Sequence, residues 1–296
     1  MSGILVIGRN GQLASSLAER AQIAGIALGF TGRPEFDMLD ADAVRRAAAA
    51  SPSSIIINAA AYTAVDDAED EPQRAFAINA DAARALAEGA CVAGARLIHI
   101  STDYVFDGRG DAPLVESDPP SPSSAYGLSK LAGEVAVREA LEDHVIVRTA
   151  WVYSPFGRNF VKTILAAART RPELRVVGDQ FGSPTSALDL ADGLLAVINR
   201  WTSEPRNGLG ATYHLAGTGA ASWAEFAQEI LAISRELGGP CVPVIPIESS
   251  QWPTKASRPL NSRLDSERFA ATFGYRAPPW KSSLRQVVER LLAGSA

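Results

Sequence analysis

The stretch Ile4–Ala14, with the sequence ILVIGRNGQLA, decides the fold. Four consecutive apolar residues predict a short buried strand, and apolar residues at helical spacing follow from Leu13 onward. Gly8 allows a tight turn between the two, and Gly11 lets the backbone approach a pyrophosphate at the helix N-terminus, where N–H groups and the helix dipole attract anions. The third position of this glycine pattern is Ala14, which still permits close packing of helix on strand. The stretch therefore predicts a dinucleotide-binding βαβ unit.

The same alternation of apolar run and helix continues through the first half of the chain. Further strands are predicted at 26–31, 55–57, 97–100 and 145–148, and helices at 40–50, 72–93 and 125–141. Strands that are apolar throughout are typical of a parallel sheet covered by helices on both faces. We therefore predict an α/β protein with a Rossmann-type doubly wound parallel sheet.

The second half of the chain is less regular and predicts a second unit. We expect residues 1–150 to form an NAD(P)-binding Rossmann domain and residues 151–296 to form mainly a smaller C-terminal substrate-binding domain. The chain is expected to return to the first domain around 184–216. We also expect a ligand cleft between the two units, because such clefts often lie at domain boundaries.

Composition excludes several classes of protein. The 296 residues carry 28 Lys and Arg against 33 Asp and Glu, a formal charge of −5, which argues against broad binding to nucleic acid or to an anionic membrane surface. The apolar runs are too short to span a bilayer. The chain begins without a basic, apolar leader and has only Cys91 and Cys241 as cysteines, so we expect a cytoplasmic protein without a disulfide framework.

The end of the second predicted strand bears on the choice of cofactor. An NAD-binding fold often places an acid about 20 residues after the glycine loop to bind the ribose hydroxyls. Here that position holds Thr31-Gly32-Arg33. Arg33 can pair with a 2′-phosphate, which favours NADPH, although a solvated loop arginine would look the same and NADH remains an alternative. Asp37 either contacts the adenine amino group or caps a turn.

Tyr126 and Lys130 are the predicted acid–base pair. They belong to the pentapeptide YGLSK at the start of a predicted helix, and their i, i+4 spacing places both side chains on one face. A phenol has a pKa of about 10, and a neighbouring ammonium lowers that pKa. The pattern alone also suits a surface tyrosine and lysine on an amphipathic helix.

A second hydroxyl supports the catalytic interpretation. Thr102 follows the predicted strand 97–100, at the carboxyl end where ligands bind in open α/β sheets. A hydroxyl there can hydrogen-bond a substrate carbonyl oxygen beside the tyrosine. The glycine loop, Thr102 and the tyrosine–lysine pair occur in the chain order expected for such a site.

On these residues the chain resembles the extended short-chain dehydrogenase/reductase superfamily, and within it the dTDP-4-dehydrorhamnose reductase family. The resemblance covers nearly the whole chain. It rests on GRNGQL (8–13), INAAAYTAVDDAE (57–69), STDYVFDG (101–108), AYGLSKLAGE (125–134), RTAWVY (148–153), NFVKT (159–163), GDQFGSPT (178–185) and SRPLNSRLD (257–265). The last three segments have no role in a generic dinucleotide fold and therefore point to the family.

The resemblance implies NAD(P)H-dependent reduction of the C4 keto group of dTDP-4-dehydro-6-deoxy-L-mannose (dTDP-4-dehydrorhamnose) to dTDP-L-rhamnose. Tyr126 would donate a proton to the forming alkoxide, Lys130 would hold the nicotinamide ribose and tune Tyr126, and Thr102 would hydrogen-bond the keto oxygen. The cofactor-binding residues are expected to be Gly8, Asn10, Gly11, Gln12, Leu13, Arg33, Asp37, Met38, Ala61, Tyr62, Thr63, Tyr126 and Lys130. The substrate-binding residues are expected to be Thr102, Asp103, Tyr104 and Trp151, with Asn159 and Arg258 at the nucleotide end.

Several residues also have simpler explanations. Trp151 can belong to the core, and Asn79 can bond to neighbouring backbone. The acidic residues of the segment 66–71 suggest a metal, but a solvated loop and helix start explains them better. Only three histidines occur, without an HxxxH or HExxH pattern, so we predict no metal site.

The sequence leaves three functions open. The first is the reduction described above. The second is another nucleotide-sugar 4-ketoreductase or a 4-epimerase, which would keep its NAD bound through turnover. The third is a non-catalytic dinucleotide-binding regulatory subunit, like the relative of this family that serves methionine adenosyltransferase, and the intact Thr102, Tyr126 and Lys130 argue against it. We expect a small-molecule nucleotide-sugar substrate and a homodimer, which is a common state for such enzymes.

Overall fold

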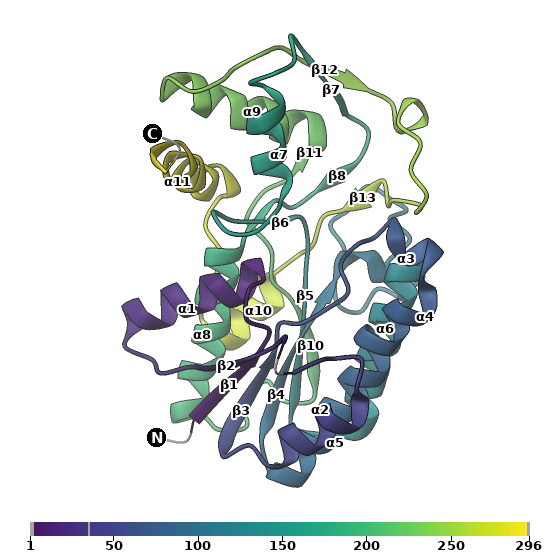
Figure 1. Cartoon of the computed structure of the whole chain (residues 1–296), viewed down its shortest axis with the longest axis vertical. Helices are drawn as coiled ribbons and strands as arrows, with labels where there is room; N and C mark the ends of the chain where they lie inside the picture. The colour runs from purple at the N-terminus through teal and green to yellow at the C-terminus, as the bar shows by residue number, and fades with distance from the viewer. Residues whose placement is uncertain (1–2, 35, 295–296) are drawn as a thin grey trace.

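The centre of the fold is a sheet of six parallel strands (Figure 1). The computed structural model describes residues 3–34 and 36–294. The strands are β1 (Gly3–Ile7), β2 (Gly29–Thr31), β3 (Ser53–Asn58), β4 (Arg96–Thr102), β5 (His144–Thr149) and β10 (Ala211–His214). Their order is β10-β5-β4-β3-β1-β2, with every neighbouring pair parallel. The chain changes its direction across the sheet between β1 and β3, and ligands bind at such switch points.

Helices cover both faces of this sheet (Figure 1). One face packs against α1 (Gln12–Ala24), α8 (Ala187–Ser203) and α10 (Glu267–Phe273), and the other against α2 (Ala41–Ala49), α5 (Ala82–Ala93) and α6 (Ala125–Ala140). Successive strand residues serve opposite faces: Ile57 belongs to the first core and Ile56 to the second. The predicted α/β fold with a Rossmann-type doubly wound sheet is confirmed.

A second group of elements packs around its own hydrophobic core. It contains the parallel pair β7 (Leu174–Val177) and β12 (Val244–Ile247) with α7 (Phe160–Ala167), α9 (Trp223–Glu236) and α11 (Trp280–Ala293). Further short strands are β6 (Val152–Tyr153) paired with β9 (Thr185–Ser186), and β8 (Phe181–Gly182) between β11 (Ala221–Ser222) and β13 (Asn261–Ser262). The domain limits stay a prediction. No helix in the described ranges is long and apolar enough to cross a membrane.

The predicted single helix 72–93 is wrong in one respect. The short α3 (Asp67–Asp70) precedes α4 (Pro72–Phe76), which loosens into a π-helical turn, η1 (Ala77–Asp81), before continuing as α5. Hydrophobic spacing could not show this turn, because the segment is rich in alanine on several faces. Such π-turns often occur at functional sites, and this one lies beside α6.

Candidate active site

The glycine loop fits the pyrophosphate of a dinucleotide. Gly8 has a φ of +117° and its N–H donates to Thr31 O at 2.7 Å, so the chain turns sharply between the ends of β1 and β2. Gly11 precedes α1, and no side chain of the described residues caps this helix, so its first N–H groups can receive an anion. A Cβ on Gly11 would extend into open space, from which a phosphate can approach. Asn10 is exposed beside it.

The side chains of the next two residues are engaged within the protein. Gln12 Nε2 donates to Val152 O at 3.3 Å, and Gln12 Oε1 accepts from Ser154 Oγ at 2.9 Å. The Leu13 side chain packs into the core. The N–H groups of both residues lie in the first turn of α1, where they suit the predicted role.

The residues predicted for the adenosine end follow β2. Arg33 is exposed, and its guanidinium is therefore accessible to a phosphate. Asp37 Oδ1 accepts from Leu39 N at 3.0 Å, which is the turn-capping alternative. Met38 packs into the core with Val44 of α2. Of the three predicted residues, Arg33 has the side chain best placed to meet a 2′-phosphate.

Asn79, in the π-turn η1, organises the loop after β3. Its amide accepts from Tyr62 N at 2.9 Å, donates to Tyr62 O at 3.1 Å and donates to Ser129 Oγ at 2.9 Å. This confirms the expectation that Asn79 bonds to backbone. The predicted cofactor-binding segment 61–63 is thereby tied to α6.

The start of α6 holds Tyr126 at the edge of the sheet. Ser124 Oγ accepts from Gly127 N at 3.1 Å and caps the helix. Gly127 allows close approach to the segment after β4, because a Cβ there would lie 2.2 Å from Tyr104 O. Tyr126 is consequently only 8% exposed, and its ring meets that of Tyr104 edge-on with centroids 5.5 Å apart.

Lys130 is buried one turn further along α6. Its Nζ donates to Ile100 O at 2.7 Å, and burial lowers the pKa of Lys130 to about 8, while the charge of Glu134 opposes the shift. Burial also raises the pKa of Tyr126 above its ordinary value, against a hydrogen bond with Thr102 that lowers it. The expected lowering of the Tyr126 pKa by Lys130 is therefore wrong, because the ammonium faces the Ile100 carbonyl and burial dominates.

Thr102 lies between Tyr126 and Asp103. Thr102 Oγ1 donates to Asp103 Oδ1 at 2.8 Å and accepts from Tyr104 N at 3.2 Å. Burial raises the pKa of Asp103 to about 6, although the hydroxyls of Thr102 and Ser262 oppose this shift. The predicted catalytic side chains thus meet where the end of β4 faces the start of α6.

Two predicted substrate-binding residues are engaged with the protein itself. Trp151 has a left-handed φ of +48°, unusual for a bulky residue, and its indole stacks on Trp223 with centroids 3.5 Å apart. Asn159 caps α7, with Oδ1 accepting from Lys162 N at 3.2 Å and Nδ2 donating to Ser154 O at 2.8 Å. One ring face of Trp151 is therefore covered, and Asn159 is better explained as the residue that shapes the turn before α7.

The third residue of this group is paired with the acidic segment 66–71. Arg258 contacts the hydroxyl of Tyr104 and forms an ion pair with Asp66. Its side chain is 24% exposed, so an anionic ligand can reach it.

Sequence reasoning missed a buried ionic network behind the site. Glu134 accepts from Arg148 Nε at 2.8 Å, from Arg148 Nη2 at 2.7 Å and from Ser101 Oγ at 2.6 Å. Burial by itself would raise the pKa of Glu134, but Arg148 lowers it below the ordinary value. The available signals were a glutamate four residues after Lys130 and an arginine in an otherwise apolar strand.

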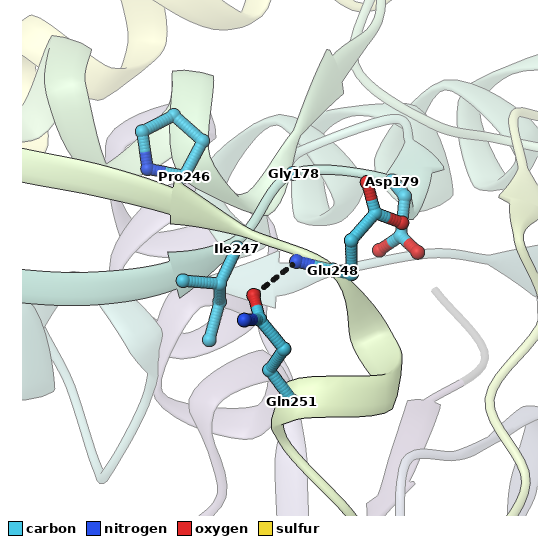
Figure 2. A pocket seen from close by; sticks show the side chains of 6 residues that line it. All are labelled: Gly178, Asp179, Pro246, Ile247, Glu248 and Gln251. Carbon is cyan, nitrogen blue, oxygen red and sulfur yellow. Dashed lines mark hydrogen bonds between the residues drawn. The ribbon is translucent and has the colours of Figure 1, made fainter.

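A separate hollow of about 250 Å³ lies at the end of β12 (Figure 2). It is lined by Gly178, Asp179, Pro246, Ile247, Glu248 and Gln251. Gln251 Oε1 accepts from Glu248 N at 3.1 Å, and Asp179 accepts from Ser249 N at 3.0 Å. The two carboxylates would repel a diphosphate, so this hollow is a poor site for one.

A dinucleotide loop after the first strand and a buried tyrosine–lysine pair beside β4, both at one sheet edge, define an oxidoreductase of the extended short-chain dehydrogenase/reductase class. The chain belongs to the dTDP-4-dehydrorhamnose reductase family: the family model described as RmlD substrate binding domain matches residues 1–293.

Individual relatives agree with this assignment. The chain is 44% identical to a dTDP-4-dehydrorhamnose reductase of Sinorhizobium fredii, over 98% of this chain and 97% of the relative. A solved dTDP-4-dehydrorhamnose reductase of Clostridium acetobutylicum is 36% identical with a TM-score of 0.90, covering 98% of this chain and 99% of that one. The Bacillus anthracis enzyme, solved in complex with NADP, is 34% identical with a TM-score of 0.89, covering 97% and 99%.

Proposed function

We propose that the protein reduces the C4 keto group of dTDP-4-dehydrorhamnose to give dTDP-L-rhamnose, with NADPH as the cofactor. The observation that carries this proposal is the meeting of Thr102, Tyr126 and Lys130 at the carboxyl edge of the sheet, next to an open glycine loop. The near full-length similarity to dTDP-4-dehydrorhamnose reductases supports the choice of substrate.

NADPH, when bound, supplies the hydride that reaches C4 of the sugar. Tyr126 gives its phenolic proton to the keto oxygen as that oxygen becomes an alkoxide, so one O–H bond breaks on the phenol and one forms on the sugar. Because burial raises the pKa of Tyr126, the phenol keeps its proton at neutral pH until the alkoxide forms. Tyr126 therefore has a proton to give when the sugar is reduced.

Thr102 and Lys130 orient this proton transfer. The Thr102 hydroxyl donates to Asp103 at 2.8 Å and must turn toward the keto oxygen to stabilise it. Lys130 would hold the nicotinamide ribose. The N–H groups of the glycine loop would hold the pyrophosphate, and Arg33 would bind a 2′-phosphate. The segment 61–63 would contact the face of the cofactor beside β3.

The pH dependence tests the role of Lys130. Its pKa is lowered to about 8, so it is an ammonium below that pH and loses its charge above it. We expect kcat/KM for NADPH to fall as the pH rises through about 8. A profile of kcat/KM that stays flat well above this pH would contradict the assigned role.

Replacement of Arg33 tests the choice of cofactor. We expect Arg33→Ala to raise the Kd of NADPH roughly tenfold, because one hydrogen bond to a charged group is lost, and to leave the Kd of NADH nearly unchanged. Arg46→Ala, which removes another exposed arginine, in α2, is the matched control. Equal weakening for both cofactors would show that Arg33 does not bind the phosphate. Fluorescence titration measures both constants.

The cytoplasmic location and the homodimer remain part of the proposal. The low cysteine content supports the first. Light scattering on the purified protein tests the second, and a mass equal to one chain would contradict it.

A coupled assay tests the proposed reaction. Absorbance of the reduced nicotinamide is followed with NADPH, then NADH, while dTDP-4-dehydrorhamnose is generated in place by the enzymes that precede it. Oxidation that depends on the sugar, with dTDP-L-rhamnose as the product, would support the proposal. Folded protein that binds the cofactor but oxidises neither NADPH nor NADH would contradict the proposal. NAD that copurifies tightly with the protein would favour an epimerase.

A further inference from the structure

Two carboxylates of the acidic segment 66–71 form ion pairs with the loop that precedes β13. Asp66 Oδ2 accepts from Arg258 Nη2 at 2.7 Å, and Asp66 Oδ1 accepts from Arg258 Nη1 and from Ala256 N, both at 3.1 Å. Asp70 forms an ion pair with Lys255. Figure 1 shows the loop between β12 and β13 coming down to α3, where these pairs form. Asp70 stays 57% exposed, as a solvated segment predicts, whereas Asp66 has additional backbone and guanidinium partners that the sequence did not predict.

Asp66 pairs with a guanidinium and is not grouped with other candidate metal ligands among the described residues. In the described part of the chain, no group of three or more His, Cys, Asp and Glu could hold a metal ion. Asp66 is instead committed to a guanidinium, which holds the pKa of this carboxyl below its usual range. Asp66 is therefore a charged, oriented partner of Arg258.

The two ion pairs differ in their relation to the catalytic site. The Arg258 side chain is 24% exposed and that of Lys255 is 61% exposed. Arg258 also contacts the Tyr104 hydroxyl, and the Tyr104 ring meets Tyr126 edge-on at 5.5 Å. One aromatic ring thus separates the guanidinium from the proton donor.

The chemistry of the substrate suggests what this guanidinium binds. In a nucleotide sugar the diphosphate is attached to C1, across the sugar ring from C4. An anion-binding group one ring width from Tyr126 is placed for that diphosphate. Arginine offers five N–H donors in a planar fork, and the bonds to Asp66 and Ala256 use three of them.

We propose that Asp66 is a positioning residue for substrate binding, because it fixes the plane of the Arg258 guanidinium for the diphosphate. The inference rests on the proposed function, since it requires a substrate that carries a diphosphate. Two effects of Asp66 oppose each other: its charge repels the diphosphate, whereas its two hydrogen bonds orient the arginine. If orientation dominates, the Kd of dTDP rises when the Asp66 charge is removed; if repulsion dominates, the Kd falls.

The test compares Asp66→Asn with the matched variant Asp70→Asn. Both remove one ion pair between the segment 66–71 and the loop before β13, but only the first releases Arg258. With the NADPH-loaded enzyme and dTDP as the probe, we expect the dTDP Kd to rise roughly tenfold in Asp66→Asn and to change by less than about twofold in Asp70→Asn. With the sugar nucleotide, KM should rise in Asp66→Asn while kcat stays close to that of the wild type.

Arg258→Lys gives a second, independent variant. Lysine keeps the positive charge but cannot make the planar two-bond contact with Asp66. The Kd of dTDP should therefore rise about as much as in Asp66→Asn. The double variant should bind dTDP no more weakly than either single variant, because the two residues act as one unit. Unchanged or tighter dTDP binding by Asp66→Asn, or equal losses in Asp66→Asn and Asp70→Asn, would overturn the inference alone. Wild-type enzyme that fails to bind dTDP would overturn the proposed function and the inference with it.

Discussion

Tyr126→Phe is expected to lower kcat by roughly two to four orders of magnitude, the usual contribution of a positioned proton donor. Phenylalanine keeps the ring and its edge-on contact with Tyr104, so the packing at the start of α6 survives. The variant lacks only the hydroxyl that Thr102 contacts and that delivers the proton. NADPH affinity should stay close to that of the wild type. Steady-state kinetics and a fluorescence titration of NADPH measure the two effects.

The matched control is Tyr213→Phe. The Tyr213 hydroxyl donates to Gly208 O at 3.2 Å, and Gly208 precedes β10, at the amino edge of the sheet and away from the site. This control should keep wild-type turnover. If Tyr126→Phe also keeps near wild-type turnover, Tyr126 is not the proton donor.

Glu134→Ala is expected to lower the free energy of unfolding by about 3–5 kcal/mol, because it leaves a buried arginine without its counter-charge. Arg148 is 2% exposed, and Glu134 binds its guanidinium with two hydrogen bonds. Arg148 Nη1 already has no hydrogen-bond partner within the described residues, so the network has no spare acceptor to replace the carboxylate. Equilibrium unfolding in urea measures the loss.

Glu139→Ala is the matched control on the same helix. Glu139 pairs with Arg84 at 2.7 Å, but both side chains are exposed, and such pairs contribute about 0–1 kcal/mol. Similar losses in the two glutamate variants would refute the special role of the buried pair. Replacing both charges, as Glu134→Leu with Arg148→Met, should recover part of the loss, since no unpaired charge stays buried.

The proposed catalytic residues Thr102, Tyr126 and Lys130 could be predicted because each of them belongs to a short local pattern. Tyr126 and Lys130 are separated by one helical turn, and Thr102 ends an apolar strand. The expected contacts of Trp151 and Asn159 were less predictable, because each residue has partners that no local pattern reveals. Trp223 is distant in the chain from Trp151, and the cap of α7 depends on where that helix begins.

The sequence by itself determined the fold class, the glycine loop at the first strand and the chain order of the catalytic groups, because apolar periodicity and helical spacing are local properties. Only the tertiary structure decided which partners the charged side chains have. Lys130 donates to the Ile100 carbonyl, and Asp66 pairs with Arg258, which lies 192 residues further along the chain. Burial then sets the pKa values of Tyr126 and Lys130. Desolvation and pairing depend on which distant segments pack together, and that information is absent from any short stretch of the chain.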